Sequence, residues 1–276
     1  MSARLLEGRP VAEAIWRDVE QRASALPRSA CLGLVSGADE AAAAYGRQIE
    51  RQFTRRGLSV LARSADANDL LDLVSGFSHD DAVDGILLLT PLPDGVNPEA
   101  AALAIDPAKD VDGQHPANLG RLAQRRKGFA PATAMGGLRL LQHYEIPLRG
   151  TRAVVVGRSP VVGMPLALLL IDADATVTVC HTRSGDLTLL TREADLLCVA
   201  AGRTGLIGPQ HIKPGAVVLD FGTNPAADGS MLGDVQPSAA EIAGAITPVP
   251  GGTGPTTVAV LAQQTVGAAE QRLGRA

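Results

Sequence analysis

Residues 157–165, with the sequence GRSPVVGMP, have the composition of a phosphate-binding turn. They follow an apolar run at 152–157 that predicts a buried strand, and they precede a run at 165–171 that predicts a helix. Loops that join a strand to a helix direct backbone N–H groups and the positive end of the helix toward phosphate. The spacing is not GxGxxG, so an ordinary structural turn is the alternative. The chemistry indicated is the binding of a dinucleotide.

The strand predicted at 176–181 ends in residues that indicate which dinucleotide binds. NAD requires an acidic residue at this strand end to accept the ribose hydroxyls, whereas the 2′-phosphate of NADP requires cations. His181 and Arg183 stand there, and the first carboxylate that follows is Asp186. Arg158 in the preceding loop is a further cation. The sequence therefore predicts NADP, and an exposed strand end is the alternative interpretation of His181 or Arg183 taken alone.

Titrating amines are scarce in this chain. Of its 25 basic residues, only three are lysines, at positions 109, 127 and 213. Guanidinium groups do not deprotonate near neutral pH, so chemistry that needs an amine has three candidates besides the amino terminus. The three cysteines form no CxxC and no metal-ligand spacing occurs, so neither a disulfide framework nor a metal site is predicted.

Length and composition narrow the class of protein. The 276 residues suggest about two domains, and a hydrophobic content of 46% supports a sizeable core and excludes a disordered chain. A net charge of −4 argues against a nucleic-acid-binding surface. No apolar run is long enough to span a membrane, and the opening residues MSARLLEGRP lack a signal-peptide core. We expect a cytoplasmic enzyme with neither nucleic-acid nor membrane partners.

Short apolar runs alternate with longer amphipathic runs, which is the pattern of parallel α/β units. The first series predicts helices at 11–26, 39–56 and 68–75 and strands at 31–37, 58–64 and 85–90. Residues 105–120 are predicted to form a long loop, and loops of that length are usually functional. The second series predicts a helix at 134–144, strands at 152–157, 176–181, 195–202, 216–222 and 245–250, and a last helix from residue 256.

Several segments together resemble the methylenetetrahydrofolate dehydrogenase/cyclohydrolase family, a bifunctional enzyme of folate one-carbon metabolism. The resemblance extends over nearly the whole chain. It rests on Tyr45, GILLLTPLP at 85–93, KDVDG at 109–113 with His115-Pro116, GRSPVVGMP at 157–165, Gly233-Asp234-Val235, and TPVPGG at 247–252 with Gly254, Pro255 and Thr257.

The resemblance implies an α/β fold of two domains, each a mainly parallel sheet flanked by helices, with the active site in the cleft between them. Residues 1–138 and 256–276 are then the folate-binding catalytic domain. Residues 139–255 are then the Rossmann-type NADP-binding domain. The family's homodimer, formed through the NADP-binding domains, is expected here as well.

The resemblance also assigns roles to individual residues. Asp112 matches the carboxylate that accepts two N–H groups of the pterin ring side by side, and Tyr45 matches the tyrosine that packs on the substrate. These two are the predicted catalytic residues. The remaining substrate-binding residues are predicted to be Pro250, Gly251 and Gly252, where backbone approaches the ligand, and Thr257, which opens the last helix. The predicted cofactor-binding residues are Gly157, Arg158, Ser159, Gly163, His181, Arg183 and Thr223.

Four places depart from the family's pattern, and two of them, Ala42 for a serine and Pro131-Ala132-Thr133-Ala134 for PCTP, lie outside the catalytic pair. The family's general catalyst is a lysine four residues after the tyrosine, and that position holds Ile49. The glutamine that holds this lysine is replaced by Leu89. No shift of the alignment restores the lysine, because none precedes Lys109. Loss of one buried polar partner leaves an unsatisfied group, whereas replacing both by apolar groups can be nearly neutral, so we interpret the two changes as coordinated.

Hydride transfer and hydrolysis make different demands on such a site. Hydride transfer requires close alignment of donor and acceptor, whereas hydrolysis of the product requires acid–base catalysis. The leading hypothesis is NADP-dependent oxidation of 5,10-methylenetetrahydrofolate to 5,10-methenyltetrahydrofolate, with cyclohydrolase activity lost or very weak. One alternative is a non-catalytic folate- and NADP-binding paralogue with a carrier or regulatory role. The other is a dehydrogenase for a modified pterin-like substrate, because two aliphatic residues make the pocket more apolar.

Overall fold

A computed structural model describes residues 3–274, which divide into two compact units. The large-sheet unit contains the amino-terminal residues up to Glu13 together with Thr133–Thr257. The small-sheet unit contains Ala14–Ala132 together with the residues from Val258 onward. Each unit is built on a parallel sheet flanked by helices, so the predicted α/β fold class is confirmed.

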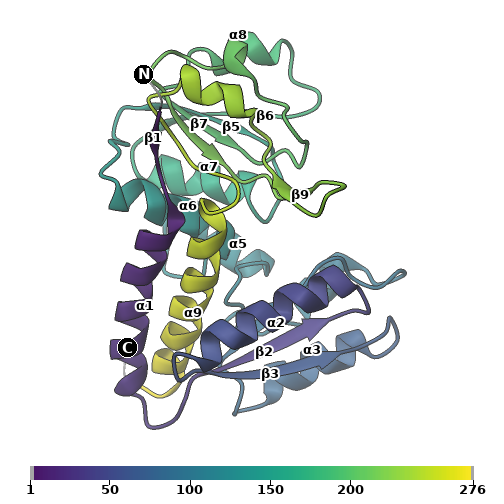
Figure 1. Ribbon diagram of the computed structural model, residues 1–276. Coiled ribbons are helices and arrows are strands. Elements are labelled where there is room, and N and C mark those ends of the chain that lie inside the picture. The colour runs from purple at the N-terminus through teal and green to yellow at the C-terminus, as the bar shows by residue number, and fades with distance from the viewer. Residues whose placement is uncertain (1–2, 275–276) are drawn as a thin grey trace. The chain divides into compact units, whose positions relative to one another are not determined.

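The small-sheet unit is built on three parallel strands, in the order β3 (Ser59–Ser64), β2 (Cys31–Ser36) and β4 (Gly85–Leu88). Side chains alternate between the two faces of a strand. A Cβ atom on Gly33 would lie 2.6 Å from the ring of Phe77 in α3 (Leu70–His79), so this position faces α3. Leu34, the next residue, packs against α2 (Glu40–Thr54). The two helices therefore cover opposite faces of the sheet (Figure 1).

Helix α2 has both a clear start signal and a clear apolar face. The side chain of Asp39 accepts a hydrogen bond of 2.7 Å from the N–H of Ala42, which satisfies one of the unpaired donors at the helix start. Its buried residues recur at intervals of three and four, as expected for a helix that packs on a sheet, and they are Ala42, Gly46, Ile49 and Phe53. The other side chains of α2 therefore lie beside this face or on the solvent side of the helix.

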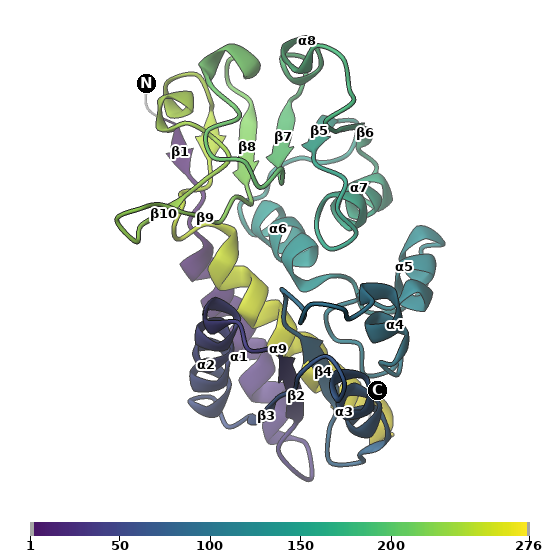
Figure 2. The same cartoon turned by 90° about the vertical axis from the view of Figure 1, so that its right-hand side faces the viewer.

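The predicted loop at 105–120 is only partly a loop, because helix α5 (Pro116–Ala123) begins within it. The ring nitrogen Nδ1 of His115 accepts the N–H of Ala117 at 3.0 Å, and proline occupies the first helical position. Asn97 begins the unpredicted helix α4 (Pro98–Leu103) in the same way (Figure 2). Both helices carry a cap residue followed by proline, a start signal that periodicity alone does not detect in helices this short.

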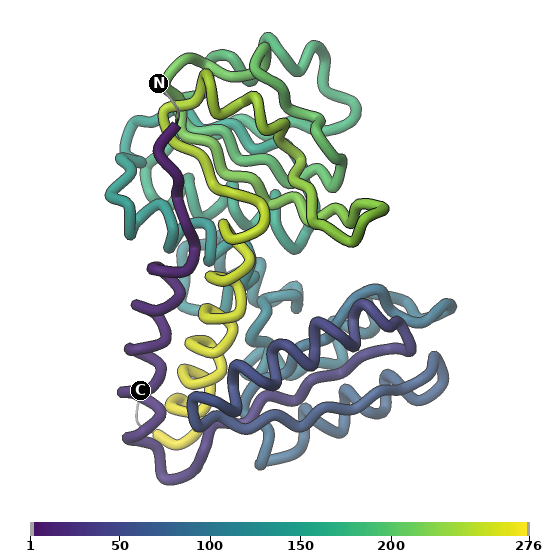
Figure 3. Tube along the Cα trace, in the orientation of Figure 1, coloured from purple at the N-terminus to yellow at the C-terminus, as the bar shows by residue number. Residues whose placement is uncertain are grey.

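Helix α9 (Thr253–Arg272) lies beside α1 (Gly8–Ser24), and the residues of both helices that belong to the small-sheet unit are those from Val258 and from Ala14 onward (Figure 3). Arg22 forms an ion pair of 2.6 Å with Glu270, and the Nε2 atom of Gln263 donates to Asp18 at 2.8 Å. The prediction placed the last helix on the first domain, and its residues from Val258 onward belong to the small-sheet unit. The helix starts at Thr253 rather than at residue 256.

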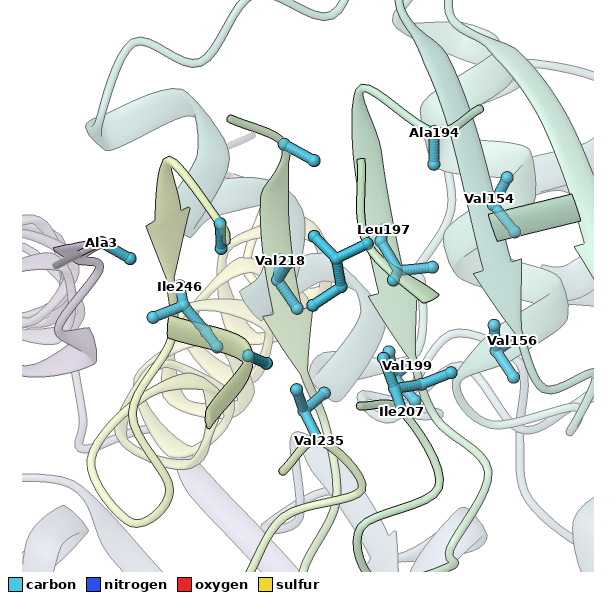
Figure 4. Close-up of a cluster of buried hydrophobic side chains, with 14 of the residues drawn as sticks. Ala3, Val154, Val156, Ala194, Leu197, Val199, Ile207, Val218, Val235 and Ile246 are labelled. Atoms are coloured by element: carbon cyan, nitrogen blue, oxygen red, sulfur yellow. The ribbon is translucent and has the colours of Figure 1, made fainter. Parts of the chain in front are cut away.

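The large-sheet unit has six parallel strands in the order β1-β11-β8-β7-β5-β6. In chain order they are β1 (Arg4–Leu5), β5 (Arg152–Val156), β6 (Thr176–Cys180), β7 (Leu196–Val199), β8 (Val217–Asp220) and β11 (Ala245–Ile246). The central strand β7 is buried along its whole length, which explains its continuous apolar sequence. Val154, Leu197, Val218 and Ile246 contribute to one hydrophobic cluster of this unit (Figure 4).

The amino-terminal residues differ from the predicted domain division. Strand β1 was not predicted, and it pairs Arg4 with Ala245 of β11 at the edge of the large sheet. Residues 3–13 therefore belong to the large-sheet unit rather than to the unit that holds most of residues 1–138. A strand of two residues carries too little periodicity to be recognised in the sequence.

The remaining elements complete the large-sheet unit. They are α6 (Ala132–His143), which starts at the unit boundary, α7 (Gly163–Asp172), α8 (Leu187–Thr191), the short 3₁₀ helices Pro209–His211 and Pro237–Glu241, and an antiparallel hairpin of β9 (Asn224–Pro225) and β10 (Met231–Leu232). Among residues 3–274, none of the helices combines the length and apolar character that crossing a membrane requires.

Asp84 joins three separate parts of the small-sheet unit, and it provides a test of how that unit is held together. Its fully buried carboxylate accepts both terminal nitrogens of Arg28, at 2.6 and 2.8 Å. It also accepts the N–H of Cys31 at 2.9 Å and Arg272 at 3.2 Å.

Asp84→Ala leaves the N–H of Cys31 and the guanidinium of Arg28 without their carboxylate acceptor, and we expect it to lower the free energy of unfolding by about 1–3 kcal/mol, measured by urea denaturation. The control is Asp81→Ala, which removes a fully exposed carboxylate from the same Arg272 and should leave the midpoint nearly unchanged. Equal midpoints for the two variants would contradict the proposed role of Asp84.

Candidate functional site

The predicted cofactor-binding residues gather at the carboxyl edge of the large sheet. Strands β5 and β6 pair with Val156 opposite Cys180, and the N–H of Gly157 donates to the carbonyl of Cys180 at 2.8 Å. The loop that begins at Gly157 therefore lies next to His181, the first residue after β6. Thr223 follows β8 at the same edge, where ligands of parallel sheets bind.

The loop after β5 can be formed only with glycine at its two ends. Gly157 has a φ of +125°, and a Cβ atom there would lie 2.1 Å from the carbonyl oxygen of Ala200. A Cβ atom on Gly163 would lie 2.2 Å from the carbonyl oxygen of Gly157. The chain is thus folded back tightly at the start of α7, which suits the close approach of backbone to a phosphate group.

Ser159 has a structural contact in this loop. Its Oγ atom accepts the N–H groups of Val162 at 3.2 Å and of Gly163 at 3.4 Å, which stabilises the turn into α7. Within the described residues its hydroxyl makes no other hydrogen bond, so its hydrogen can be donated to a phosphate oxygen.

The charged groups at this edge favour an additional phosphate. Arg158 and Arg183 are exposed and follow neighbouring strands of the sheet. The ring nitrogen Nδ1 of His181 accepts the N–H of Arg183 at 3.1 Å, so the turn after β6 is ordered. Asp186 does not extend back toward this edge, because its carboxylate accepts the N–H of Thr188 and starts α8. The strand end therefore offers cations and no acidic acceptor for a ribose hydroxyl.

The buried carboxylate of Asp234 supports the carboxyl edge of the large sheet. In the sequence, Asp234 is noted only as part of the motif Gly-Asp-Val. Asp234 is fully buried, and its side chain accepts the N–H groups of three consecutive residues and the amide of Asn224, at 2.7–2.9 Å. The three residues, Ala201, Gly202 and Arg203, follow Ala200, whose carbonyl packs on Gly157. The pattern Gly-Asp-Val gave no sign of these contacts, because they join segments about thirty residues apart.

Asp220, the last residue of β8, joins the end of that strand to the segment that holds Asp234. Its carboxylate accepts the N–H groups of Gly222, Asp234 and Val235, at 2.8–3.0 Å. Burial raises the pKa of Asp220, and these hydrogen bonds oppose the shift. The two aspartates thus serve to order backbone, and their donors leave little capacity for a ligand.

The small-sheet unit holds the predicted substrate carboxylate, Asp112. The isolated pairing of Ile86 with Asp110 fixes the loop along the edge of β4, and the N–H of Ile86 donates to Lys109 at 2.7 Å. Asp112 is partly exposed, and its two oxygens accept the Nε2 atom of Gln114 at 2.7 Å and the N–H of Ala132 at 3.1 Å.

The environment of Asp112 opposes its ionisation. Burial raises its pKa to about 6, the hydrogen bonds from Gln114 and Ala132 oppose the shift, and the charge of Asp110 adds to it. The side chain is still reached by solvent, so it lies in surroundings dominated by protein without being closed off. A carboxylate in this state gains much from two N–H donors of a ligand.

The two charged residues before Asp112 have structural roles. Asp110 accepts the N–H groups of Gln114 and His115 and the amide of Asn118, at 2.8–2.9 Å. The Nζ atom of Lys109 donates to two carbonyls at the end of α3, those of Phe77 and Asp80, at 3.1 and 2.7 Å. Burial lowers the pKa of Lys109, but both carbonyls retain its ammonium group at the helix end.

Tyr45 and Asp112 are brought together within the small-sheet unit. Tyr45 is 39% exposed, while its hydroxyl end is surrounded by protein. Burial, with a further contribution from the charge of Asp112, raises the pKa of Tyr45 to about 12. Its hydroxyl therefore stays protonated near neutral pH, and the ring offers an accessible apolar surface for a ligand.

Ile49 and Leu89, which stand where the resemblance implies a lysine and a glutamine, lie in the apolar interior. Ile49, one turn after Tyr45, is 0% exposed, and Leu89 is 5% exposed. A Cβ atom on Gly46 would lie 3.1 Å from Cδ1 of Leu89 and 3.2 Å from Cδ2 of Leu34, so Leu89 packs directly on α2. Ile49 and Leu89 thus both belong to the apolar packing between the helix and the sheet.

The segment Pro250–Gly252 and Thr257 lie in the large-sheet unit. At Gly252 the neighbour that leaves no room for a side chain is another part of the backbone, because a Cβ atom there would lie 2.6 Å from the carbonyl oxygen of Pro248. Gly251 is exposed, has a φ of +104°, and accepts the N–H of Gly8 at 2.8 Å through its carbonyl. Thr257 lies in the second turn of α9 and does not open the helix as predicted.

Comparisons with known proteins agree on one family. The model of the tetrahydrofolate dehydrogenase/cyclohydrolase catalytic domain matches residues 6–112, and that of the family's NAD(P)-binding domain matches residues 131–273. The bifunctional protein FolD of Chloroflexus aggregans is 48% identical, covering 99% of this chain and all of that protein.

Solved structures give the same result. The bifunctional FolD methylenetetrahydrofolate dehydrogenase/cyclohydrolase of Campylobacter jejuni has a TM-score of 0.95 at 37% identity, covering 98% of this chain and all of that one. The Trypanosoma brucei enzyme, complexed with NADP cofactor and inhibitor, has a TM-score of 0.93 at 33% identity, with both chains covered completely.

The raised pKa of Asp112 predicts how its removal affects stability. Between about pH 4 and pH 6 the folded chain binds more protons at this site than the unfolded chain, so this carboxyl group makes stability fall as the pH rises through that range. Asp112→Asn should therefore raise the free energy of unfolding by up to ~3 kcal/mol at pH 7, and by much less at pH 4.

Denaturation at the two pH values measures this difference, with Asp66→Asn as a control at an exposed site of the same unit. A stabilisation by Asp112→Asn that is the same at both pH values would contradict the shifted pKa.

Proposed function

This chain belongs to the tetrahydrofolate dehydrogenase/cyclohydrolase family, and from that premise we propose that it is an NADP-dependent dehydrogenase for 5,10-methylenetetrahydrofolate. The product is 5,10-methenyltetrahydrofolate, and the family's cyclohydrolase step is lost or very weak. The observation that carries this second part is the buried apolar pair Ile49 and Leu89 at the positions where the resemblance implies a lysine and a glutamine.

The large-sheet unit supplies the groups that hold NADP. Its tight loop at Gly157 and Gly163 has no room for a side chain, so backbone can approach the pyrophosphate. The hydroxyl of Ser159 is placed to donate to a phosphate oxygen, and Thr223 lies at the same sheet edge. Arg158, Arg183 and the ring of His181 form the cationic site for the 2′-phosphate.

The substrate's pterin ring is assigned to the small-sheet unit. The carboxylate of Asp112 accepts two N–H groups of the aminopyrimidine edge, and the ring of Tyr45 packs on its face. The substrate contacts predicted from the resemblance for Pro250–Gly252 and Thr257 belong to the large-sheet unit.

Oxidation of the substrate places few demands on side-chain chemistry. NADP, when bound, accepts the hydride that leaves the bridging methylene carbon. The lone pair of the adjacent substrate nitrogen stabilises the resulting cation, so no residue has to take up a proton. What this chain must provide is orientation, and Asp112 and Tyr45 provide it by fixing the plane of the ring.

Hydrolysis of the methenyl product requires proton transfer, for which the described site offers no amine. Ile49 and Leu89 cannot move a proton. The ammonium group of Lys109 is bonded to carbonyls at the end of α3, and that of Lys213 is paired with Asp195. Lys127 is exposed in the segment after α5 and not on the helix that carries Tyr45. Arg47 and Arg51 lie on the exposed side of α2, away from the face that holds position 49.

An assay of the purified protein tests the dehydrogenase. Mixed with 5,10-methylenetetrahydrofolate and NADP, it should form NADPH at a rate proportional to its concentration, and NAD should support a slower rate. A carrier or regulatory paralogue would bind both ligands in calorimetry without forming NADPH. A dehydrogenase for a modified pterin would show turnover only with that other substrate.

We assign the homodimer expected from the resemblance to the large-sheet unit. Met231 and Leu232 are exposed on the short hairpin of β9 and β10, and exposed apolar side chains of this kind favour contact with a second copy. Analytical ultracentrifugation should give about twice the chain mass of 28.4 kDa, whereas a single species at the chain mass would contradict the dimer.

The pair at positions 49 and 89 predicts a gain of function that needs both changes. Ile49→Lys with Leu89→Gln restores an amine and the amide that holds it, and we expect consumption of 5,10-methenyltetrahydrofolate to rise by about 10²-fold. Ile49→Lys alone places an ammonium group against apolar Leu89, and Leu89→Gln alone supplies no amine, so each single change should restore little.

Arg47→Lys is the matched control, because it places an amine on the exposed side of the same helix and should give no gain. A gain from Ile49→Lys alone as large as that of the double variant would contradict the coordinated change.

A further inference from the structure

The side chain of Gln264, on helix α9, joins the two chain segments that hold Asp112. Its Nε2 atom donates to the carbonyl oxygens of Val111 at 2.6 Å and of Ala130 at 2.9 Å. Its Oε1 atom accepts the N–H of Ala130 at 3.2 Å. A single amide thus makes three hydrogen bonds to backbone, and none of them lies within its own helix.

The two bridged segments are those that determine the direction of the Asp112 carboxylate. Val111 immediately precedes Asp112, and Ala130 lies two residues before Ala132, whose N–H donates to Asp112. The segments are also in direct contact, because Gly113 has a φ of +59° and a Cβ atom there would lie 2.6 Å from the carbonyl carbon of Ala130. Any change in the separation of these segments therefore moves the carboxylate.

We propose that Gln264 is a positioning residue for the substrate, which holds the carboxylate of Asp112 in place through Val111 and Ala130. The proposal rests on the function proposed above, in which Asp112 binds the pterin ring. Recognition of two N–H groups side by side depends on the plane of the carboxylate, so a small displacement weakens both hydrogen bonds together.

Other groups near Asp112 cannot replace this contact. Gln114 donates to Asp112 itself and does not reach Ala130, and Asp110 orders the turn at Gln114 and His115. Tyr45 lies near enough for the charge of Asp112 to raise its pKa, but it belongs to α2. Only Gln264, among the described residues, has hydrogen bonds to both flanking segments.

The neighbouring residue on α9 provides a matched control. Gln263 is also partly buried, but its Nε2 atom donates to Asp18 of α1 at 2.8 Å. Successive residues of a helix point about 100° apart, so two adjacent glutamines serve different contacts. Replacing either by methionine preserves most of the volume and removes the hydrogen bonds.

The experiment compares Gln264→Met with Gln263→Met. We expect Gln264→Met to raise the calorimetric Kd for tetrahydrofolate, and the KM for methylenetetrahydrofolate, by about tenfold. The KM for NADP should change less than twofold, because the cofactor groups lie in the large-sheet unit. Gln263→Met should leave all three constants within twofold of the unmodified chain. Equal folate constants for the two variants would overturn the proposal.

Hydrogen exchange supplies a readout that does not depend on turnover. In Gln264→Met the amides at 130–132 should exchange faster, and in Gln263→Met they should not. Absence of NADPH formation by the unmodified chain would overturn the proposed function, while exchange and tetrahydrofolate binding still decide the role of Gln264. If Gln264→Met does not fold, Gln264→Asn takes its place, because asparagine keeps an amide on a shorter side chain. Unchanged tetrahydrofolate affinity in Gln264→Asn, together with a lowered free energy of unfolding, would overturn the proposal.

Discussion

The packing of helix α2 on the three-stranded sheet is the constraint from which the chemistry of this chain follows. The helix presents Ala42, Gly46, Ile49 and Phe53 to the sheet, and Leu89 approaches it closely because Gly46 has no side chain. With that face buried, Tyr45 stands at its edge, partly exposed and close to Asp112. Position 49 is then inside the apolar layer, where an amine would require a polar partner, and Leu89 is not one. The function proposed above places the substrate's packing surface at the edge of this helix face and leaves no proton-transfer group at position 49.

Carboxylates are used in this chain in two distinct ways. Asp84, Asp110 and Asp234 are fully buried and serve backbone N–H groups or arginines, so their charges order the chain. Asp112 is the partly exposed carboxylate in the same loop as Asp110, and burial raises its pKa to about 6. Destabilisation of this kind is expected of a group that is set up for a ligand rather than for the folded chain alone. The hydrogen bonds of Gln264 to the two flanking segments are the basis of the positioning role proposed for it.

The sequence predicted the elements whose signals are local and long enough. Central strands such as β5 and β7 are buried on both faces and read as continuous apolar runs, and α2 has both a cap and a periodic face. Strand β1 is not predicted because it has only two residues and forms a strand only by pairing with β11. Helix α5 is not predicted because its start signal is the cap residue His115, which a search for periodicity does not detect. The supporting contacts of the site, from Lys109 to α3 and from Gln264 to Val111, join residues far apart in the chain. No local pattern encodes such pairs, so only the resemblance could indicate Asp112, and nothing indicated Gln264.

The proposed function predicts that this chain forms 5,10-methenyltetrahydrofolate and hydrolyses it very slowly or not at all, and the balance of the two products measures this. A limiting amount of methylenetetrahydrofolate is oxidised with excess NADP, and NADPH and the methenyl product are quantified together over time. We predict that they form in equal amounts and that the methenyl product then decays at the rate seen without protein. A deficit of methenyl product that grows in proportion to the protein concentration, matched by 10-formyltetrahydrofolate, would contradict the proposed loss of cyclohydrolase activity.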